Sequence, residues 1–353
     1  MATGATELGQ LLKVTVERAA SDLIISPGAS PALRLVGGIE FLESARLDGA
    51  ATSRMMMSVL TEAQRARLES EKELDFAFTV KGLSRFRGNA YYCVGGLACA
   101  IRVIPARPPT LEELDLPKSL ADFALRPRGL FLACGPTGQG KTTTLASMLQ
   151  IINAHKRVHV VTVEDPVEFV HASDKSIIDQ RDVGAHTLSY SNALRSVLRQ
   201  DPDVILIGEM RDAETMQAAI TAAETGHLVL GCVHTNDSAQ SMDRIVDMFP
   251  YERHDTVREK LALTLTAVLS LKLLPPKTGV RRVPAYELMI NNTAAAHLIR
   301  EGRTVNLYQL IETSARDGMI SMDARIKELF LSGRIGFDAA KRNVRDPKAL
   351  ESL

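Results

Sequence analysis

The sequence predicts a two-domain α/β protein whose larger domain is built on a parallel sheet. Three observations predict this fold class: strands with an antiparallel pattern in the first hundred residues, short apolar strands alternating with helices after residue 119, and a proline-rich polar stretch between them. A chain of 353 residues is long enough to bury two cores. We therefore expect an α+β domain over residues 1–105, a linker over 106–118 and an α/β domain over 119–353.

The N-terminal domain combines two predicted helices with a meander of strands. Apolar residues at helical spacing predict a helix over 8–20 and another over 49–70. Runs rich in β-branched and aromatic residues, bounded by glycine and proline, predict the strands. These are 21–26, 31–42, 74–80, 84–94 and 97–105.

The C-terminal domain alternates strands with helices, which is typical of a parallel sheet covered on both faces. The predicted strands are 129–135, 158–165, 204–209 and 227–235. Helices are predicted over 143–152 and over 212–224, where Asp212 is the expected N-cap and Gly226 lies beyond the C-terminus. From about residue 251 the pattern predicts a helical C-terminal region, 251–353.

The composition is that of an ordinary soluble globular protein, and we expect it to be cytoplasmic. Lys and Arg together number 42, as do Asp and Glu, and this balance argues against non-specific nucleic-acid binding. No window of about 18 consecutive apolar residues predicts a membrane-spanning helix. The four cysteines show no zinc-ligand spacing and are expected to be buried free thiols in a reducing compartment.

The segment "GPTGQGKTTT" matches the phosphate-binding loop pattern G-x-x-x-x-G-K-[ST]. It follows a predicted strand and opens a predicted helix, which is the context that the pattern requires. Its glycines allow backbone N–H groups to surround phosphates, Lys141 can reach the outer phosphates, and the Thr142 hydroxyl can ligate Mg²⁺. No guanine-reading motif is found, which favours ATP. The predicted nucleotide-binding residues are Gly135, Pro136, Thr137, Gly138, Gln139, Gly140, Lys141, Thr142 and Thr143.

Ionisable residues follow the other predicted parallel strands, where ligands bind such sheets. Glu164, Asp165 and Glu168 surround Pro166 after the second strand, and Glu209 ends the third. Carboxylates this close to a phosphate loop would repel each other unless a cation or water network used them.

Two histidines flank the fourth predicted strand. His234 stands at its carboxyl end, where a γ-phosphate sensor would stand, and His227 stands at its start, one strand length away. A lone histidine at a strand end is usually structural, but the neighbouring phosphate loop favours a nucleotide-linked role for His234 and, less strongly, for His227.

Four motifs together resemble the secretion-type ATPases, and most closely the PilT-like pilus retraction motors. In chain order, "GPTGQGKTTT" resembles the family's Walker A motif, "VTVEDPVEFVH" its Asp box, "LRQDPDVILIGEMRD" its Walker B motif and "TGHLVLGCVHTNDSAQSMDRIVDMFP" its His box. The likeness covers nearly the whole chain. It implies an N-terminal PAS-like domain, a C-terminal RecA-like P-loop ATPase domain, and a ring-shaped homo-hexamer with ATP at the domain and subunit junctions.

The resemblance also implies roles for individual residues. Glu209 would polarise the attacking water, and Thr142 would hold Mg²⁺ together with the Asp-box acids. We expect Asp165 to help bind the metal ion, and we expect Glu164 and Glu168 to act in catalysis. Which of the three acids contributes most stays open. Arg87 and Arg102 would reach the phosphates as arginine fingers, which can contribute roughly 10³–10⁵ in rate.

The function implied is ATP-driven pilus retraction and twitching motility, at an inner-membrane platform protein with which the motor associates peripherally. Two departures leave alternatives open. Ile24 stands where relatives often carry histidine, and Ala296-His297 replaces an Arg-Asn pair in a segment associated with retraction. An accessory PilU-like paralogue, working beside a principal motor, is therefore one alternative.

Three further alternatives have less support. A pilus assembly or type II secretion ATPase typically carries a tetracysteine zinc site and a longer N-terminal region, both absent from this sequence. A RecA-like nucleic-acid motor would be expected to show a basic channel, and the even charge balance offers none. Finally, a non-catalytic scaffold would not need Lys141, Thr142, Glu209 and His234 together.

Overall fold

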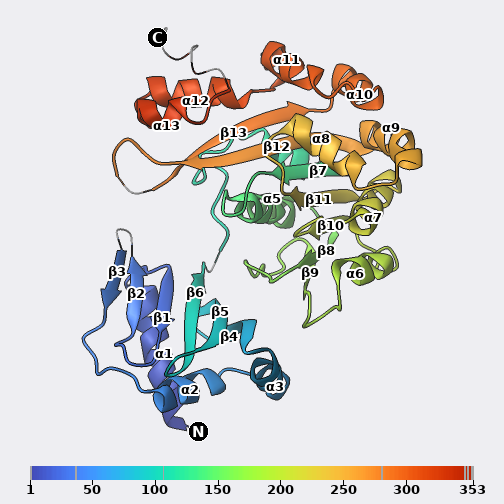
Figure 1. Cartoon of the computed structure of the whole chain (residues 1–353). Helices are drawn as coiled ribbons and strands as arrows, with labels where there is room; N and C mark the ends of the chain where they lie inside the picture. The colour runs from blue at the N-terminus through green and yellow to red at the C-terminus, as the bar shows by residue number, and fades with distance from the viewer. Residues whose placement is uncertain are drawn as a thin grey trace. The chain divides into compact units, whose positions relative to one another are not determined.

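The computed structural model describes residues 2–35, 38–105, 107–279, 281–345, 347 and 350 (Figure 1). Ala106, the first residue of the predicted linker, lies outside the described residues. The chain divides into two compact units, Met1–Arg107 with Glu168–Val170, and Pro108–Val167 with His171–Leu353. Each unit combines helices with a sheet, so the chain is mixed α/β.

The first unit holds a six-stranded antiparallel sheet in the order β3-β2-β1-β6-β5-β4. Helices α1–α3 supply apolar residues to a core that also contains Leu23, Leu33, Phe86 and Ile101 of the sheet. The elements are α1 (Ala2–Glu17), β1 (Asp22–Ile25), β2 (Ala32–Leu35), β3 (Gly38–Phe41), α2 (Gly49–Met57), α3 (Glu62–Glu71), β4 (Glu73–Val80), β5 (Ser84–Cys93) and β6 (Gly96–Ile104).

The single helix predicted over 49–70 is wrong, because the structure has two helices there. Helix α2 ends at Met57 and α3 begins at Glu62. Thr61 starts the second helix with a capping box, in which its side chain accepts from the Gln64 backbone and the Gln64 side chain accepts from the Thr61 backbone. This reciprocal pair satisfies two N–H groups of the new helix and favours a fresh start over continuation.

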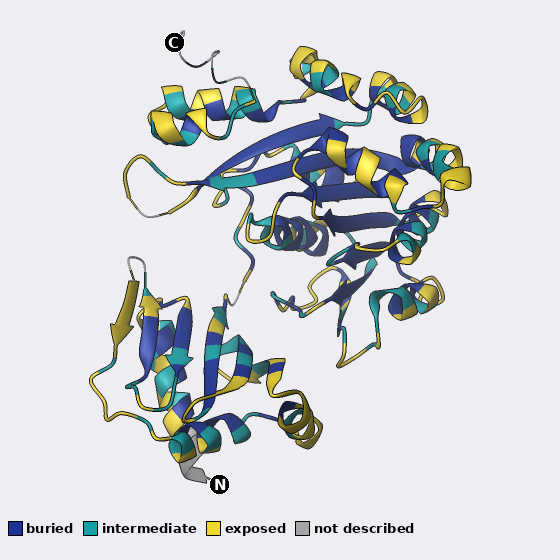
Figure 2. Ribbon diagram, in the orientation of Figure 1, coloured by how far each residue is buried: buried dark blue, intermediate teal, exposed yellow. Residues whose placement is uncertain are grey.

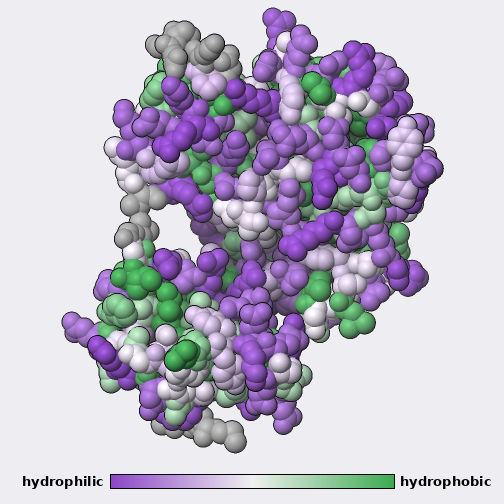
Figure 3. Space-filling model, in the orientation of Figure 1, coloured by the Kyte–Doolittle hydropathy of each residue, from purple (hydrophilic) through white to green (hydrophobic). Residues whose placement is uncertain are grey.

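Apolar side chains are exposed at one edge of this sheet. All four residues of β3 are exposed, including Ile39 at 48% and Phe41 at 64%. The surface view shows hydrophobic areas on this unit (Figure 3). Exposed apolar edges of this kind are commonly covered in assemblies.

The second unit holds a seven-stranded sheet in the order β13-β12-β7-β11-β10-β8-β9. Six of these strands are parallel, and β13 joins antiparallel to β12. The elements up to β11 are α4 (Leu120–Ala124), β7 (Gly129–Cys134), α5 (Lys141–His155), β8 (His159–Glu164), β9 (Ile177–Asp182), α6 (Tyr190–Val197), β10 (Val204–Ile207), α7 (Ala213–Glu224) and β11 (Leu228–Val233). They continue with α8 (Ser238–Asp247), η1 (Tyr251–Arg253), α9 (His254–Thr264), β12 (Leu265–Leu274), β13 (Val283–Ile290), α10 (Thr293–Arg300), α11 (Asn306–Thr313), η2 (Ala315–Asp317), α12 (Met322–Leu331) and α13 (Phe337–Lys341).

Both faces of this sheet are covered, as its continuous apolar strands require. One core lies between the sheet and α4 and α5, and another lies between the sheet and α6–α11. The central strands are buried throughout (Figure 2). The four predicted parallel strands and the Asp212 N-cap, whose side chain accepts from the Thr215 N–H, are confirmed.

The prediction that residues 251–353 are helical is wrong for two long segments. Strand β12 extends the parallel sheet beside β7, and β13 pairs with it from Ala267 to Leu274. A buried apolar run lacks the alternation that separates a strand from a buried helix, so the sequence pattern could not distinguish them.

The proline-rich stretch is packed from Pro108 onward. Leu111 and Leu116 are buried in the core beneath α4 and α5. Thr110 and Glu113 form a reciprocal backbone–side-chain pair at 2.7 and 3.1 Å that shapes the turn. Residues 108–118 therefore belong to the second unit. None of the helices in the described part of the chain is both long and apolar enough to span a bilayer.

Candidate nucleotide-binding and hydrolysis site

The carboxyl ends of four adjacent parallel strands meet at one edge of the large sheet. Val233 at the end of β11 pairs with Cys134 at the end of β7, and Ile207 at the end of β10 pairs with Val163 near the end of β8. The segments that follow these strands carry the predicted phosphate loop, His234, Glu209 and the Asp box. The topology thus brings four separate sequence motifs to one edge.

The phosphate loop occupies residues 135–140, between β7 and α5. Gly135 has φ 142°, and a Cβ at this position would lie 2.6 Å from the Leu271 carbonyl oxygen. Only glycine therefore fits where the chain leaves the strand. Gly140, at φ 90°, is the N-cap of the 15-residue helix α5, whose N-terminus favours an anion.

Lys141, the first residue of α5, is 7% exposed. Its Nζ donates to the Gly135 carbonyl at 2.6 Å and to the Pro136 carbonyl at 2.9 Å, so the ammonium group lies within the loop. Burial lowers the pKa of Lys141, while nearby groups that include Glu209 act in the opposite direction. The geometry places a cation where phosphate oxygens would meet the backbone N–H groups.

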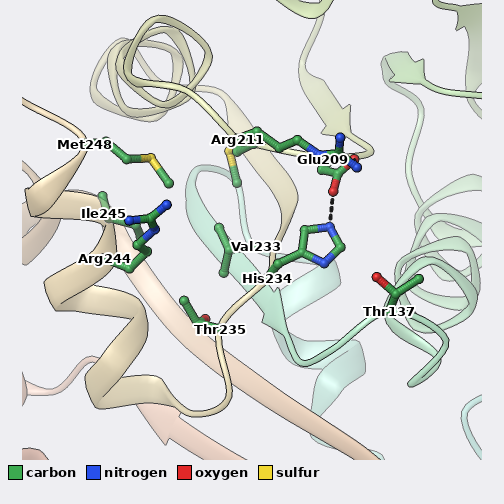
Figure 4. Close-up of a pocket in the computed structure, with 10 residues that line it drawn as sticks. Thr137, Glu209, Arg211, Val233, His234, Thr235, Arg244, Ile245 and Met248 are labelled. Carbon is green, nitrogen blue, oxygen red and sulfur yellow. Dashed lines mark ion pairs between the residues drawn. The ribbon is translucent and has the colours of Figure 1, made fainter.

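Glu209 is held from two sides at the end of β10 (Figure 4). Its Oε1 pairs with Nε2 of His234, and its Oε2 lies 2.7 Å from a guanidinium nitrogen of Arg211. Nδ1 of His234 lies 3.4 Å from Nζ of Lys141. Because an ammonium group can only donate, this contact favours the tautomer in which Nε2 carries the hydrogen and donates to Glu209. Burial, followed by the Lys141 charge, lowers the pKa of His234 and keeps its ring neutral.

Gly208 leaves room for Glu209. A Cβ on Gly208 would lie 3.1 Å from the Tyr190 hydroxyl, 3.2 Å from Cα of Glu164 and 3.3 Å from the Val163 carbonyl oxygen. Its own N–H donates to that carbonyl at 2.8 Å. The glycine therefore allows the ends of β8 and β10 and the Tyr190 ring to approach closely.

A pocket with a volume of about 350 Å³ opens beside Glu209. Its walls are formed by the Glu209–His234 pair, two arginines and several apolar side chains, as Figure 4 shows. The lining residues are Thr137, Glu209, Met210, Arg211, Val233, His234, Thr235, Arg244, Ile245 and Met248. A half-buried carboxylate next to a neutral histidine and a phosphate loop can orient a water molecule and accept its proton.

The Asp-box acids differ in their surroundings. Glu164 is 6% exposed and accepts from the Thr162 hydroxyl at 2.7 Å and from the Gln180 amide at 3.2 Å. It lines a small cavity together with Thr142. Asp165 follows at an exposed position. Thr142 and these carboxylates are hard oxygen donors, which fit Mg²⁺ because this ion keeps several waters and takes one or two protein carboxylates together with substrate phosphates.

The Type II/IV secretion system protein model matches residues 13–331, which is most of the chain. The chain belongs to the Type II/IV secretion system protein family. The chain is 42% identical over 321 residues to a twitching motility protein of Neisseria gonorrhoeae, covering 91% of this chain and 86% of that one. It is 41% identical over 342 residues to the type IV pilus retractation ATPase PilT of Pseudomonas aeruginosa, covering 97% of this chain and 99% of that one.

A solved structure of this secretion family shares the whole fold. The crystal structure of the pilus retraction motor PilT with bound ADP superposes with a TM-score of 0.91 at 43% identity. The match covers 98% of both chains.

In the present chain, not every predicted site residue lies at the end of the sheet that carries the phosphate loop. His227 precedes Leu228 at the amino end of β11, and its Nδ1 lies 2.9 Å from the Ala222 carbonyl oxygen and 3.2 Å from the Thr225 hydroxyl. Six strand residues, or about 20 Å at 3.3 Å per residue, separate it from His234. His227 therefore lies apart from the phosphate edge of its own chain, and its nucleotide-linked role stays a prediction.

Arg87 and Arg102 lie directly opposite each other on β5 and β6 of the first unit. Arg102 also bonds to Asp22 at 2.9 Å, yet its side chain stays 67% exposed. Glu168 groups with this unit and is half-buried. The two arginines share one face of their sheet, as arginine fingers would require.

Sequence reasoning missed several residues around Glu209. Arg211 pairs with it, Tyr190 approaches Gly208, and His171 lines the cavity that contains Thr142. Burial lowers the pKa of His171 to about 4, so its ring is neutral at physiological pH. The motif "GEMRD" could have pointed to Arg211, since it lies two residues after the predicted catalytic acid.

Proposed function

We propose that this chain is an ATP-hydrolysing motor that drives retraction of type IV pili. The observation that carries the enzymatic part is the meeting of Lys141, Glu209 and neutral His234 at one sheet edge. The retraction role is supported by the similarity to proteins described as pilus retraction motors over nearly their full length. The proposal includes twitching motility as the cellular outcome.

The residues divide the chemistry among them. Residues 135–143 hold the phosphates of ATP, and Lys141 offsets their charge. Glu209 orients the attacking water and takes its proton, while His234 fixes the carboxylate. Thr142 and Asp165 would hold Mg²⁺, which when bound neutralises charge on the phosphates, and Glu164 and Glu168 assist catalysis. Arg87 and Arg102 stabilise the charge that develops as the outer phosphate leaves.

We further propose that the chain works as a homo-hexamer of PAS-like and RecA-like domains. The exposed apolar side chains of β3 are the kind of surface that an assembly covers. A motor of this function docks on an inner-membrane platform protein from the cytoplasm and drives pilin disassembly by domain motion. Because residues 108–118 pack on the second unit, the hinge for this motion would lie immediately before Pro108.

The experiment compares purified wild-type chain with Glu209→Gln. The wild type should hydrolyse ATP, and the variant should lose at least about a hundredfold in kcat while still binding a fluorescent ATP analogue. Arg199→Gln is the control, because the Arg199 side chain lies in the turn after α6 and donates to the Arg195 carbonyl. A Glu209→Gln chain that turned over ATP at the wild-type rate would refute the catalytic assignment.

Deletion of the gene tests the cellular role. Cells that become hyperpiliated and cannot twitch support retraction, whereas cells without pili indicate an assembly ATPase. An accessory role beside a paralogous motor is the second candidate, because Ala296-His297 in α10 departs from the retraction segment. In that case deletion would weaken twitching without abolishing it, because the principal motor would remain.

A further inference from the structure

Two carboxylates lie together at the N-terminus of α8, at the same end of the sheet as the phosphate loop, because Glu287 pairs with Ser270 and Ser270 pairs with Cys134 at the end of β7. Asp237 is the N-cap of this helix, and its Oδ1 accepts from the Gln240 N–H at 2.9 Å. Glu287 of β13 is 1% exposed and accepts from the Ser238 N–H at 3.1 Å. Burial raises the pKa of Glu287, and two carboxylates this close together are both ionised only where a cation offsets their charge.

Arg345, beyond the last helix, supplies that cation in the part of the chain that the structure describes. One guanidinium nitrogen lies 3.2 Å from Oδ2 of Asp237 and 3.8 Å from Oε2 of Glu287. The guanidinium carbon lies 3.6 Å from the ring centre of Tyr308, whose hydroxyl donates to Asp237 at 3.1 Å. The Arg345 N–H donates to both carboxylate oxygens of Asp323, which fixes the backbone.

This cluster is connected to the phosphate loop through buried hydroxyl groups. Oγ of Ser270 lies 3.5 Å from Glu287 and 3.3 Å from Oγ of Ser238. It also accepts from the Cys134 thiol at 3.0 Å. Burial raises the pKa of Cys134 to about 11, which keeps the thiol protonated as a donor. Cys134 immediately precedes Gly135.

The segment 234–238 spans the distance between this cluster and the hydrolysis site. His234 contacts Glu209 at one end, and Asp237 contacts Arg345 at the other. Between them, the Thr235 and Ser241 hydroxyls bond to each other at 2.5 Å, and Ser241 donates to the Asp237 carbonyl at 2.7 Å. A segment this short and this fully bonded transmits a displacement of one end to the other.

We propose that Arg345 is a positioning residue for hydrolysis, which acts through Asp237 and Glu287 to hold His234 against Glu209. Without the guanidinium, the two carboxylates repel each other, the first turn of α8 shifts, and His234 moves with the segment. The inference rests on the proposed ATPase function. It gives the C-terminal end of the chain an influence on the rate of the chemical step.

The test compares Arg345→Met with wild type in kcat and in affinity for a fluorescent ADP analogue. We expect kcat to fall roughly threefold to thirtyfold, while the dissociation constant stays within about twofold because the phosphate loop is intact. Arg345→Lys should retain most of the rate. Arg342→Met is the matched control, since Arg342 on the same segment bonds to the Asp338 carbonyl and should leave kcat unchanged.

A second variant separates positioning from general destabilisation. Glu287→Gln in the Arg345→Met background removes one of the repelling charges and keeps an oxygen that can accept from Ser238. It should recover at least about half of the lost kcat. A wild-type kcat in Arg345→Met, or a joint loss of rate and nucleotide binding that Glu287→Gln does not relieve, would overturn the proposal. No hydrolysis by the wild type would instead refute the proposed function itself.

Discussion

Gly208 shows how one missing side chain shapes the site. Its Cβ position faces the Tyr190 hydroxyl and the backbone of β8 at 3.1–3.3 Å, and backbone cannot give way as a flexible side chain can. Gly208→Ala should therefore lower the free energy of unfolding by about 1–3 kcal/mol and reduce kcat as Glu209 shifts. Urea unfolding and ATPase assays measure both effects.

Two further variants test whether the close contacts at Gly208 cause the expected loss of stability. Tyr190→Phe added to Gly208→Ala removes the nearest contact and should recover part of the stability. Gly9→Ala, in helix α1 with nothing near the added Cβ, should instead stabilise by about 0.5–1 kcal/mol. If Gly208→Ala behaved like Gly9→Ala, the close approach at the ends of β8 and β10 would not matter.

His234 gives the site a dependence on pH. Its pKa is below the ordinary value of about 6.5, chiefly because of burial, so the unfolded chain binds the proton more readily than the folded chain. The stability contributed by neutral His234 is therefore complete above the ordinary pKa and is lost as the pH falls through it. Melting temperatures between pH 8 and pH 5 should fall less in His234→Gln than in wild type. Equal slopes would contradict a neutral His234 in the folded state.

At the residue scale, spacing predicted part of the site and long-range contacts determined the rest. The phosphate loop, Glu209 and His234 could be placed because each follows a buried strand of a parallel sheet. One strand length separates His227 from His234 in the sequence, and this spacing indicated that the two histidines lie at opposite ends of β11. Arg211 could have been suspected from its position two residues after Glu209, but Tyr190 could not be placed, because its contact with Gly208 depends on how the chain turns after β9.

At the scale of elements, the capping residues at helix ends predicted the structure better than the pattern of apolar residues did. Asp212 accepts from the Thr215 N–H at 2.8 Å and from its hydroxyl at 3.0 Å, as an N-cap should. The capping box at Thr61 was an equally readable signal that 49–70 holds two helices. By contrast, β12 is buried on both sides and β9 reads "IIDQRD" at the sheet edge, so neither shows the alternation that marks a strand.

The N-cap of α7 can be tested directly. Asp212→Ala leaves the Thr215 N–H without its side-chain acceptor and should cost about 1 kcal/mol in unfolding free energy, whereas Asp212→Asn keeps an acceptor and should cost less. Because this helix begins four residues after Glu209, kcat should fall in the same order. Equal stability of the alanine and asparagine variants would show that the cap does not hold this turn.

At the scale of the whole molecule, the proposed hexamer would allow catalytic groups on different chains to act together. Arg87 and Arg102 belong to the first unit and Glu209 to the second. If arginine fingers act between subunits, two inactive chains can complement each other. An Arg87→Ala chain has an intact Glu209, and a Glu209→Gln chain has an intact Arg87.

Mixing the two inactive chains distinguishes action between subunits from action within one. At equal amounts and random assortment, about a quarter of the interfaces would join an intact finger to an intact Glu209, so activity should rise well above that of either variant alone. Native mass spectrometry shows whether mixed particles have formed. Because one chain carrying both substitutions cannot complete a site with itself, its mixture with Glu209→Gln provides the background. Activity no higher than this background in proven mixed particles would mean that Arg87 acts within its own chain or not at all.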